Sequence, residues 1–489
     1  MMDHKPPAFK MIYQFNLDSQ IPKDHFLRLV ESAVDFSFVR DMVRGFYSDR
    51  GAPSIDPVVI FKMSLLGYFY RISSERRLAE ECNYNLAFKW FLKYDIDEGT
   101  PDHSIFSKAR ARFGRDTYEK FFAEIVRKCG EKGLIEGDKV FIDATLVKAN
   151  ASRKSIVRRG EYLELKQSPK EYLDDVWAEN PVESDEDDTA GPRGGGSTES
   201  GKKVRTNDTV VSKTDPDASL VARRGAGPML AHKVHIAVAD GKARIVTAVT
   251  TTPGAVHEHE EVATLLQKHR FITRGEPQEV VADTAYGVRK VFTFLSSRGI
   301  QANIPTRTTN VTARRKKEAG FRYDADRDVW VCPEGKTMYK MSQSKAPGHT
   351  LYMVHKGACA SCPRHGELCM AKRPSIVDSR RDHLLNRVKA YTETDAAKET
   401  FRRRKCQVEP AFGELKTSRG MRQAVLRGNW KVQIQALMAF AAYNIKRLLK
   451  GTTPVVKSAQ TAVPTGVCSL VESVHRFFRF GYSAGPAFC

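Results

Sequence analysis

Residues 408–416 read Val-Glu-Pro-Ala-Phe-Gly-Glu-Leu-Lys and predict an amphipathic helix that continues a basic run. The apolar residues recur at helical spacing and are expected to face a core; they are Val408, Ala411, Phe412 and Leu415. Glu409 falls near a different stripe of this helix, together with Arg402, Lys405 and Lys416. A single acid among cations has little chemical meaning, so the role of Glu409 depends on carboxylates elsewhere in the chain.

The composition indicates a globular protein of more than one domain with an excess of positive charge. Of the 489 residues, 41% are hydrophobic and 28% are charged, which argues against disorder. Lys and Arg number 79 against 58 Asp and Glu, a formal charge of +21, which favours nucleic acid as the partner. Ribosomal proteins, chaperones and ordinary enzymes can also be basic. Because no apolar stretch is long enough to span a membrane and no secretion signal is recognisable, we expect no membrane partner and a cytoplasmic location.

Four of the nine cysteines lie in one stretch of the chain. The odd total and the scatter of the other five argue against a disulfide framework. The clustered four include a Cys-x2-Cys pair and predict a structural Zn²⁺ site in a small zinc ribbon; they are Cys332, Cys359, Cys362 and Cys369. Reduced cysteines without a metal are the alternative, and His355 and His365 are alternative fourth ligands.

Residues 1–135 carry helix-period patterns and predict an all-helical N-terminal region. The predicted helices span 26–42, 57–70, 76–82, 86–92, 103–113 and 118–132. The helix at 103–113 is rich in cations, and its Lys108, Arg110 and Arg112 are candidates for binding DNA. Short helices followed by a basic one resemble a helix-turn-helix, but a helical bundle with a solvated basic face fits the same pattern.

Residues 136–305 change to the pattern of a mixed α/β sheet flanked by helices. Two apolar strands carry acids: Asp143 lies in the strand at 139–145, and Asp283 follows the strand at 279–282. An acid in an apolar strand is costly unless it is paired or bound to a metal, although an Asp at a strand end can also serve only to shape a turn. Further strands are predicted at 232–238, 245–251 and 301–305, and helices at 256–271 and 288–297.

Two insertions interrupt the predicted sheet. Residues from about 155 to 228 include an acidic block and a Gly-rich stretch, and we expect this segment to be loop-rich and disordered. Residues 306–398 form the small cysteine-rich β insertion. Residues 399–450 return to the core as C-terminal helices, and residues 451–489 form a peripheral tail.

Three acids can meet in such an arrangement: Asp143, Asp283 and Glu409. Clustered carboxylates repel one another unless a cation is present, and Mg²⁺ or Mn²⁺ prefers oxygen ligands of this kind. Two such ions can activate a water or a 3′-hydroxyl for attack on a phosphodiester. Lys416, two turns beyond Glu409, is placed to hold a phosphate. Three other acids are less well placed. Asp138 precedes the strand, Asp240 lies in a hairpin turn, and Glu414 lies off the Glu409 stripe of the helix.

The order of these motifs resembles that of the DDE transposases of bacterial insertion sequences. Phe-Ile-Asp-Ala-Thr at 141–145 resembles the first-Asp strand of that family, and Thr-Pro-Gly-Ala-Val-His at 252–257 resembles its TPGxxH turn. Residues 281–287 resemble its second-Asp motif, and residues 408–413 its acid motif.

The family signature Tyr-x2-Arg-x3-Glu-x6-Lys is matched here by Glu409 and Lys416. Phe401 takes the place of the Tyr, but Phe401 and Arg404 both lie one residue upstream of the signature spacing, and Lys405 occupies the Arg spacing. The cysteine-bearing insertion also resembles one found in a subset of these transposases.

The resemblance implies an RNase H-like catalytic domain and a DNA transposase of the two-metal-ion type. Such a protein would bind terminal inverted repeats, cleave there with Mg²⁺ or Mn²⁺, and transfer the freed strand to target DNA. Asp143, Asp283 and Glu409 would be metal ligands, Lys416 a catalytic residue, and Arg404 or Lys405 a DNA contact. The same resemblance implies a homodimer that holds two double-stranded DNA ends. It also implies a bacterial protein that is located at the nucleoid. A catalytically inactive DNA-binding derivative and a metal-dependent nuclease without strand transfer are the alternatives.

Overall fold

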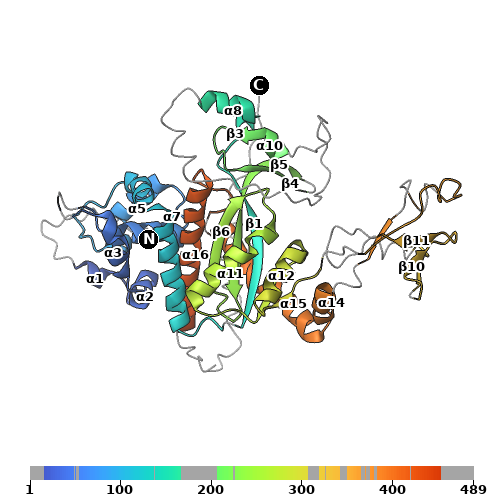
Figure 1. Ribbon diagram of the computed structural model, residues 1–489. Helices are drawn as coiled ribbons and strands as arrows, with labels where there is room; N and C mark the ends of the chain where they lie inside the picture. The colour runs from blue at the N-terminus through green and yellow to red at the C-terminus, as the bar shows by residue number, and fades with distance from the viewer. Residues whose placement is uncertain are drawn as a thin grey trace, which may run out of the picture. The chain divides into compact units, whose positions relative to one another are not determined.

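The computed structural model describes residues 16–452 with several gaps (Figure 1). The gaps are 49, 51–53, 137, 167–205, 224–225, 307–318, 325, 342–349, 365–368, 370–374, 379–382 and 419. The acidic block and the Gly-rich stretch of the first insertion, His365, and the tail after residue 452 therefore lie outside the described residues.

The N-terminal region is helical, as the sequence predicts, although the single helix predicted at 26–42 is two helices in the structure. Its helices are α1 (Leu17–Gln20), α2 (Phe26–Ala33), α3 (Phe38–Val43), α4 (Pro57–Tyr70), α5 (Glu75–Tyr84), α6 (Leu86–Leu92) and α7 (Ser104–Glu131). α4 begins where the Asp56 side chain accepts a hydrogen bond from the Val58 amide, with Pro57 in the first turn. α7 covers both helices predicted at 103–113 and 118–132, and it kinks between them at Gly114, whose φ is 65°.

A six-stranded mixed sheet lies at the centre of the fold; β1, β5 and β6 are labelled in Figure 1. Its strands are β1 (Lys139–Lys148), β4 (Ser219–Arg223), β5 (Ala226–Ala239), β6 (Val246–Pro253), β7 (Glu279–Val281) and β8 (Gln301–Asn303). β5 pairs antiparallel with β1 on one edge and with β4 and β6 on the other. β7 pairs parallel with β1, and β8 pairs parallel with β7. The helix α12 (Arg289–Ser297) makes the crossover from β7 to β8, and α11 (Val262–Thr273) connects β6 to β7.

Helices cover both faces of the sheet. Successive side chains of β1 point to opposite faces, so they pack into two different cores. Val140 and Ile142 pack with residues of α11 and α12. Phe141 and Val147 pack with residues of α15 (Asp395–Ser418), α16 (Asn429–Thr452) and the N-terminal helices. Asp143 shares the alternation of Phe141, so its side chain belongs to the face that α15 covers.

Side-chain amides of α16 satisfy the outer edge of β6. The Asn444 side chain accepts a hydrogen bond from the Val246 amide at 3.0 Å and donates one to the Val246 carbonyl at 2.8 Å. Gln433 donates to the Val249 carbonyl, and Asn429 donates to the Thr251 carbonyl. An edge strand normally exposes such groups, so the polar residues of α16 close the sheet on this side.

Replacing Asn444 with Leu is expected to destabilise the fold by about 2–4 kcal/mol, because it leaves the buried amide and carbonyl of Val246 without partners. Asn444 has no exposed surface, so water cannot replace the lost bonds. Thermal unfolding would measure the effect, with Lys450→Ala, an exposed change on the same helix, as the control. Equal melting temperatures for the two variants would contradict this account of the edge.

The described parts of residues 155–228 are more regular than expected. They contain β2 (Ile156–Arg158), α8 (Arg159–Lys166), α10 (Thr206–Thr209), β3 (Val210–Ser212) and β4. The Asn207 side chain bonds to both the amide and the carbonyl of Leu220, at 2.8 and 3.1 Å. Bonds of this kind, between a polar side chain and the backbone, leave no hydrophobic pattern in the sequence.

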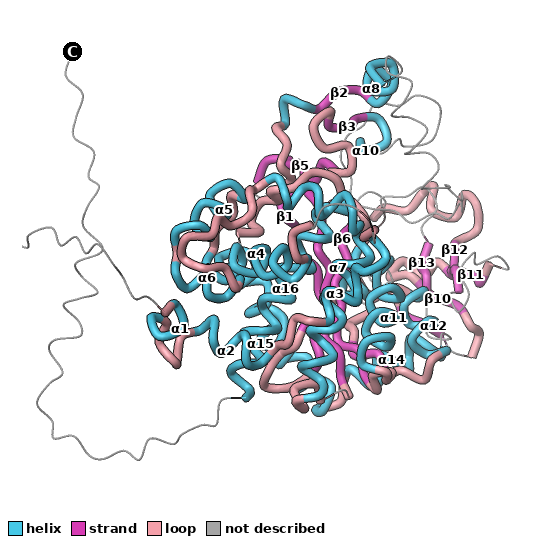
Figure 2. The backbone as a smooth tube through the Cα atoms, turned by 90° about the vertical axis from the view of Figure 1, so that its left-hand side faces the viewer, coloured by secondary structure: helices cyan, strands magenta, loops and turns pink. Residues whose placement is uncertain are grey.

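The second insertion contains a separate antiparallel sheet, whose strands β10 to β13 are labelled in Figure 2. Its strands are β9 (Arg322–Asp324), β10 (Val329–Val331), β11 (Thr337–Lys340), β12 (Thr350–Met353) and β13 (Ser375–Asp378). The buried core is small and consists of Phe321, Trp330, Met338, Tyr352, Val354 and Ile376. α14 (His383–Thr392) follows and places Leu385 and Val388 in the core beneath α12. Across the described part of the chain, no helix has the length and apolarity needed to cross a membrane.

Candidate active site

Asp143 lies in the middle of the central strand β1, opposite Ile236 of β5. Its carboxylate accepts a hydrogen bond from the Ala144 amide at 2.8 Å and forms an ion pair with Arg404 of α15 at 2.9 Å. The side chains of both partners are largely buried, at 21% and 14% exposure. The ion pair explains how the sheet tolerates an acid at this position, since a lone buried charge would be expensive.

Asp283 lies just after β7, the parallel neighbour of β1. Its carboxylate accepts a hydrogen bond from the Ala285 amide at 2.9 Å, which starts the short helix η4 (Thr284–Tyr286). Burial raises the pKa of the Asp143 carboxyl, the Arg404 charge lowers it, and the nearby Asp283 charge raises it again. The two acids predicted from the strands are therefore close enough to interact electrostatically.

Glu258 is a third acid in this neighbourhood, and the sequence did not identify it. It begins the short helix η3 (Glu258–Glu261), which contacts η4. Its carboxylate lies 3.6 Å from the Lys233 ammonium. Burial raises the pKa of Glu258, the Lys233 charge lowers it, and the charges of Asp283 and Asp143 raise it further. The only signal in the sequence is its position next to the Thr-Pro-Gly-Ala-Val-His turn.

Helix α15 carries the predicted cations, and the structure distinguishes between Arg404 and Lys405. Arg404 contacts Asp143, whereas Lys405 is exposed. Arg404, which lies one position upstream of the Arg in the family signature, is thus the residue that contacts the Asp143 carboxylate.

Glu409 lies about one and a half turns beyond Arg404 on the same helix, and Lys416 lies about two turns beyond Glu409. Glu409 is exposed and Lys416 partly so. Val408, Ala411 and Leu415 of this helix are buried in the core, and Phe412 packs against it partly buried, as the amphipathic pattern predicts. Among the contacts of the described residues, none places Glu409 against Asp143 or Asp283, so the convergence of all three acids stays a prediction.

Two of the rival acids have structural partners. Asp240 accepts hydrogen bonds from Arg403 at 2.6 Å and from Gln407 at 3.4 Å. Glu414 lies 3.6 Å from Arg447 of α16. Both contacts fix α15 to its surroundings, which accounts for these acids without a catalytic role.

The donor chemistry of the site suits Mg²⁺ or Mn²⁺, because the carboxylates of Asp143, Asp283 and Glu258 offer the oxygen ligands that these ions prefer. Within the described ranges, however, no three His, Cys, Asp or Glu side chains are spaced to hold a metal ion. A metal-bound arrangement would therefore require these carboxylates to approach one another.

The basic residues of α7 differ in how accessible they are to a partner. Arg110 is largely buried and pairs with Glu75, with one contact at 3.1 Å. Arg112 is exposed, and its guanidinium lies 5.1 Å from the centre of the Tyr47 ring. Lys108 is exposed. Lys108 and Arg112 are therefore accessible to a partner, while the Arg110 side chain supports the packing of α5 on α7.

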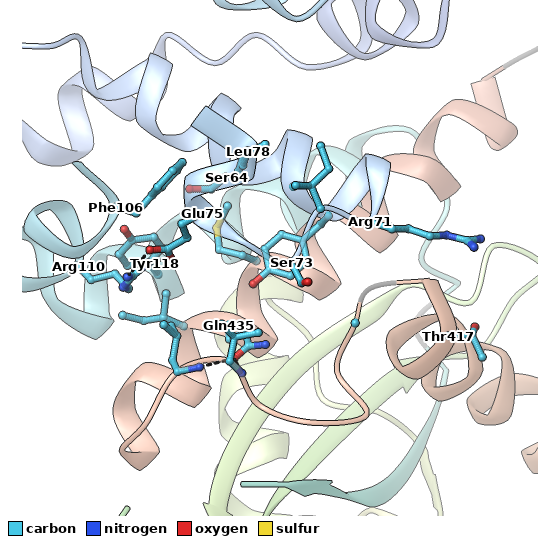
Figure 3. Close-up of a pocket in the computed structure, with 18 residues that line it drawn as sticks. Ser64, Arg71, Ser73, Glu75, Leu78, Phe106, Arg110, Tyr118, Thr417 and Gln435 are labelled. Carbon is cyan, nitrogen blue, oxygen red and sulfur yellow. Dashed lines mark hydrogen bonds and ion pairs between the residues drawn. The ribbon is translucent and has the colours of Figure 1, made fainter. Parts of the chain in front are cut away.

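A cavity of about 230 Å³ lies between the N-terminal helices and the start of α16. Figure 3 shows Glu75, Arg110 and Tyr118 close together on one side of it and Gln435 below them. None of Asp143, Asp283 and Glu409 is among its lining residues in the described part of the chain. The cavity is thus separate from the carboxylate site.

The four clustered cysteines surround one small cavity in the second insertion. Cys332, Cys359, Cys362 and Cys369 all line a space of about 20 Å³, and all four are free thiols. Burial raises the pKa of Cys359, and the neighbouring thiols of Cys362, Cys369 and Cys332 raise it further. The structure therefore brings together the four residues that the sequence grouped.

Comparisons with known proteins agree with the resemblance of the motifs. The family model described as "Transposase domain (DUF772)" matches residues 15–112, and the one described as "Transposase DDE domain" matches residues 331–449. No curated protein sequence matches the chain. Among solved structures, the chain is similar to a cryo-EM structure of the piggyBac transposase synaptic complex with hairpin DNA, at 10% identity, with 87% of this chain and 74% of that chain covered and a TM-score of 0.34. A TM-score this low carries no argument, so the assignment rests on the two family models.

Proposed function

Since the chain belongs to the DDE-type transposases, we propose that it binds the terminal inverted repeats of an insertion sequence, cleaves DNA there and transfers the freed strand to a target. The observation that carries the proposal is the pair of Asp143, in strand β1, and Asp283, just after the adjacent parallel strand β7. Two interacting carboxylates at the centre of a sheet, in a chain with a charge of +21, suit metal-dependent chemistry on a polyanion.

The proposed catalytic domain is RNase H-like. Its support is the strand order, in which three antiparallel strands (β6, β5, β1) are followed by two strands parallel to the last of them (β7, β8). The first acid lies in the central strand and the second follows its parallel neighbour. The third acid of the proposal, Glu409, comes from α15, whose buried face packs on the same side of the sheet as Asp143.

Asp143, Asp283 and Glu409 are the residues that would hold two Mg²⁺ or Mn²⁺ ions, and Glu258 is a further oxygen donor beside them. When bound, such ions supply an activated water or 3′-hydroxyl and stabilise the leaving oxygen of a phosphodiester. Arg404 orients and neutralises Asp143 in the free protein. With a cation bound at that carboxylate, Arg404 would be available to hold a DNA phosphate next to the reacting group.

DNA would be bound by exposed cations outside the carboxylate site. Lys108 and Arg112 on α7 are accessible for phosphate contacts, and Lys416 lies on the helix that carries Glu409. The simultaneous use of two transposon ends calls for a homodimer. Binding dominated by phosphate contacts would weaken steeply with added salt.

Replacing Arg404 with Gln is expected to lower strand cleavage by about 10²-fold, because it removes a charged contact from the reacting centre. The matched change Lys405→Gln, one residue along on the exposed side of α15, should alter the rate by less than about threefold. Single-turnover cleavage of end DNA with Mg²⁺ measures both. A larger loss for Lys405→Gln would show that the family spacing, and not the observed ion pair, identifies the functional cation.

The function is tested by incubating the full chain with DNA carrying the element ends, a target plasmid and Mg²⁺. Cleavage at the ends followed by joined products supports transposition. Cleavage without joining supports the metal-dependent nuclease, and binding in Ca²⁺ without cleavage in Mg²⁺ supports the inactive DNA-binding derivative. Asp143 and Asp283 are close enough to interact, which favours the active enzyme over the last of these.

A further inference from the structure

We propose that Cys332, Cys359, Cys362 and Cys369 bind one structural Zn²⁺ ion that stabilises the small sheet of β9 to β13. The four thiols line a single cavity of about 20 Å³, which is room for one water-sized or ion-sized occupant. Four thiolates are a common tetrahedral ligand set for Zn²⁺. This role is structural and independent of the carboxylate site.

Two tight turns present the sulfurs to the cavity. In the first turn, the Gly335 amide donates to the Cys332 carbonyl at 2.9 Å, and the Lys336 amide donates to the Cys332 sulfur at 3.2 Å. In the second turn, the Cys362 amide donates to the Cys359 carbonyl at 3.3 Å. An amide that points at a sulfur stabilises the thiolate, which is the outer-shell support expected of a metal ligand.

The charges and the alternative ligands favour a site made of four cysteines. Four thiolates around Zn²⁺ leave a net charge of −2, and Lys336 and Arg364 line the same cavity. His355 does not line it; its ring lies 4.6 Å from the Tyr339 ring instead. His355 is thus a poorer fourth ligand than Cys369, which faces the cavity.

The sheet needs a stabilising element beyond its hydrophobic core. Its strands are only three or four residues long, and six buried residues form the core. A core of this size supplies little stability by itself. Cys332, Cys359 and Cys369 pack directly against it, so a metal held by them would join the turns to the strands. Because no three of these thiols are at ligating spacing in the structure, binding must draw them together.

The test is the zinc content of the full-length protein, measured by elemental analysis after expression with added Zn²⁺ and gel filtration. We expect one zinc per chain, and at least about a tenfold loss of bound zinc in Cys362→Ser and Cys332→Ser. The matched control is Cys406→Ser, an exposed free cysteine on α15, which should keep the full content. Wild-type protein without zinc, or equal zinc in Cys362→Ser and the control, would overturn the proposal.

A second measurement covers the case in which the variants fail to fold. In the wild-type protein, alkylation followed by mass spectrometry should find the four thiols protected until a chelator is added, while Cys406 reacts throughout. Equal reactivity of all five before chelation would contradict the site. Neither measurement uses DNA or catalysis, so failure here leaves the proposed transposase activity untouched, and failure of that activity leaves the zinc site untouched.

Discussion

Replacing Asp143 with Asn is expected to lower Mg²⁺-dependent cleavage of end DNA by at least about 10³-fold. The substitution nearly keeps the shape of the side chain, but its single amide oxygen can accept from only one of the two present donors, the Ala144 amide or Arg404. What it removes is the negative charge that a divalent cation needs. Asp283→Asn should cause a loss of the same order, since its charge lies beside that of Asp143.

The control for this prediction is Asp138→Asn, an acid that immediately precedes β1. It should leave cleavage within about threefold of wild type, as expected for a substitution away from the site. Single-turnover rates, together with the melting temperature of each variant, separate a catalytic loss from misfolding. Full activity in a folded Asp143→Asn protein would remove that residue from the proposed site.

The second large effect is expected for Glu409→Gln, again a loss of at least about 10³-fold. Its matched control lies on the same helix: Glu414→Gln changes an acid that pairs with Arg447 at 3.6 Å, and it should affect cleavage by less than about threefold. Both changes keep the helix and the volume of the side chain. The comparison therefore tests whether the loss of cleavage depends on which of the two carboxylates is neutralised.

Glu258→Gln decides between two identities of the third ligand. Glu409 is exposed on α15, whereas Glu258 already interacts with Asp143 and Asp283 in the free protein. If Glu409 is the third ligand, its variant is the inactive one and Glu258→Gln keeps substantial activity. An inactive Glu258→Gln variant beside an active Glu409→Gln variant would make Glu258 of η3 the third ligand and contradict the proposed role of Glu409.

The strands that carry the two aspartates could be predicted because burial leaves a clear pattern. β1 and β7 are short apolar runs, and an acid within or after such a run is conspicuous. The helices α4 and α6 were predicted with the bounds that the structure has, since apolar residues at helical period mark them. The domain boundaries stay a prediction.

The remaining features depend on contacts that no local pattern contains. Glu258 was placed inside a helix predicted at 256–271, whereas the chain first forms the short η3 and starts α11 only at Val262. The partner of Asp143 could not be chosen between Arg404 and Lys405 from spacing, because the choice depends on which side of α15 faces β1. The edge of β6 is closed by Asn444 through a contact with Val246, almost 200 positions away in the chain.

The most direct test of the account is the position of Mn²⁺ in crystals of the protein with end DNA, found by anomalous diffraction. The account predicts a Mn²⁺ peak within ligating distance of the Asp143 and Asp283 carboxylates, with Glu409 completing the site and Arg404 turned to a phosphate. A Mn²⁺ peak away from Asp143 and Asp283, or these two carboxylates still occupied only by Arg404 and backbone amides, would contradict it.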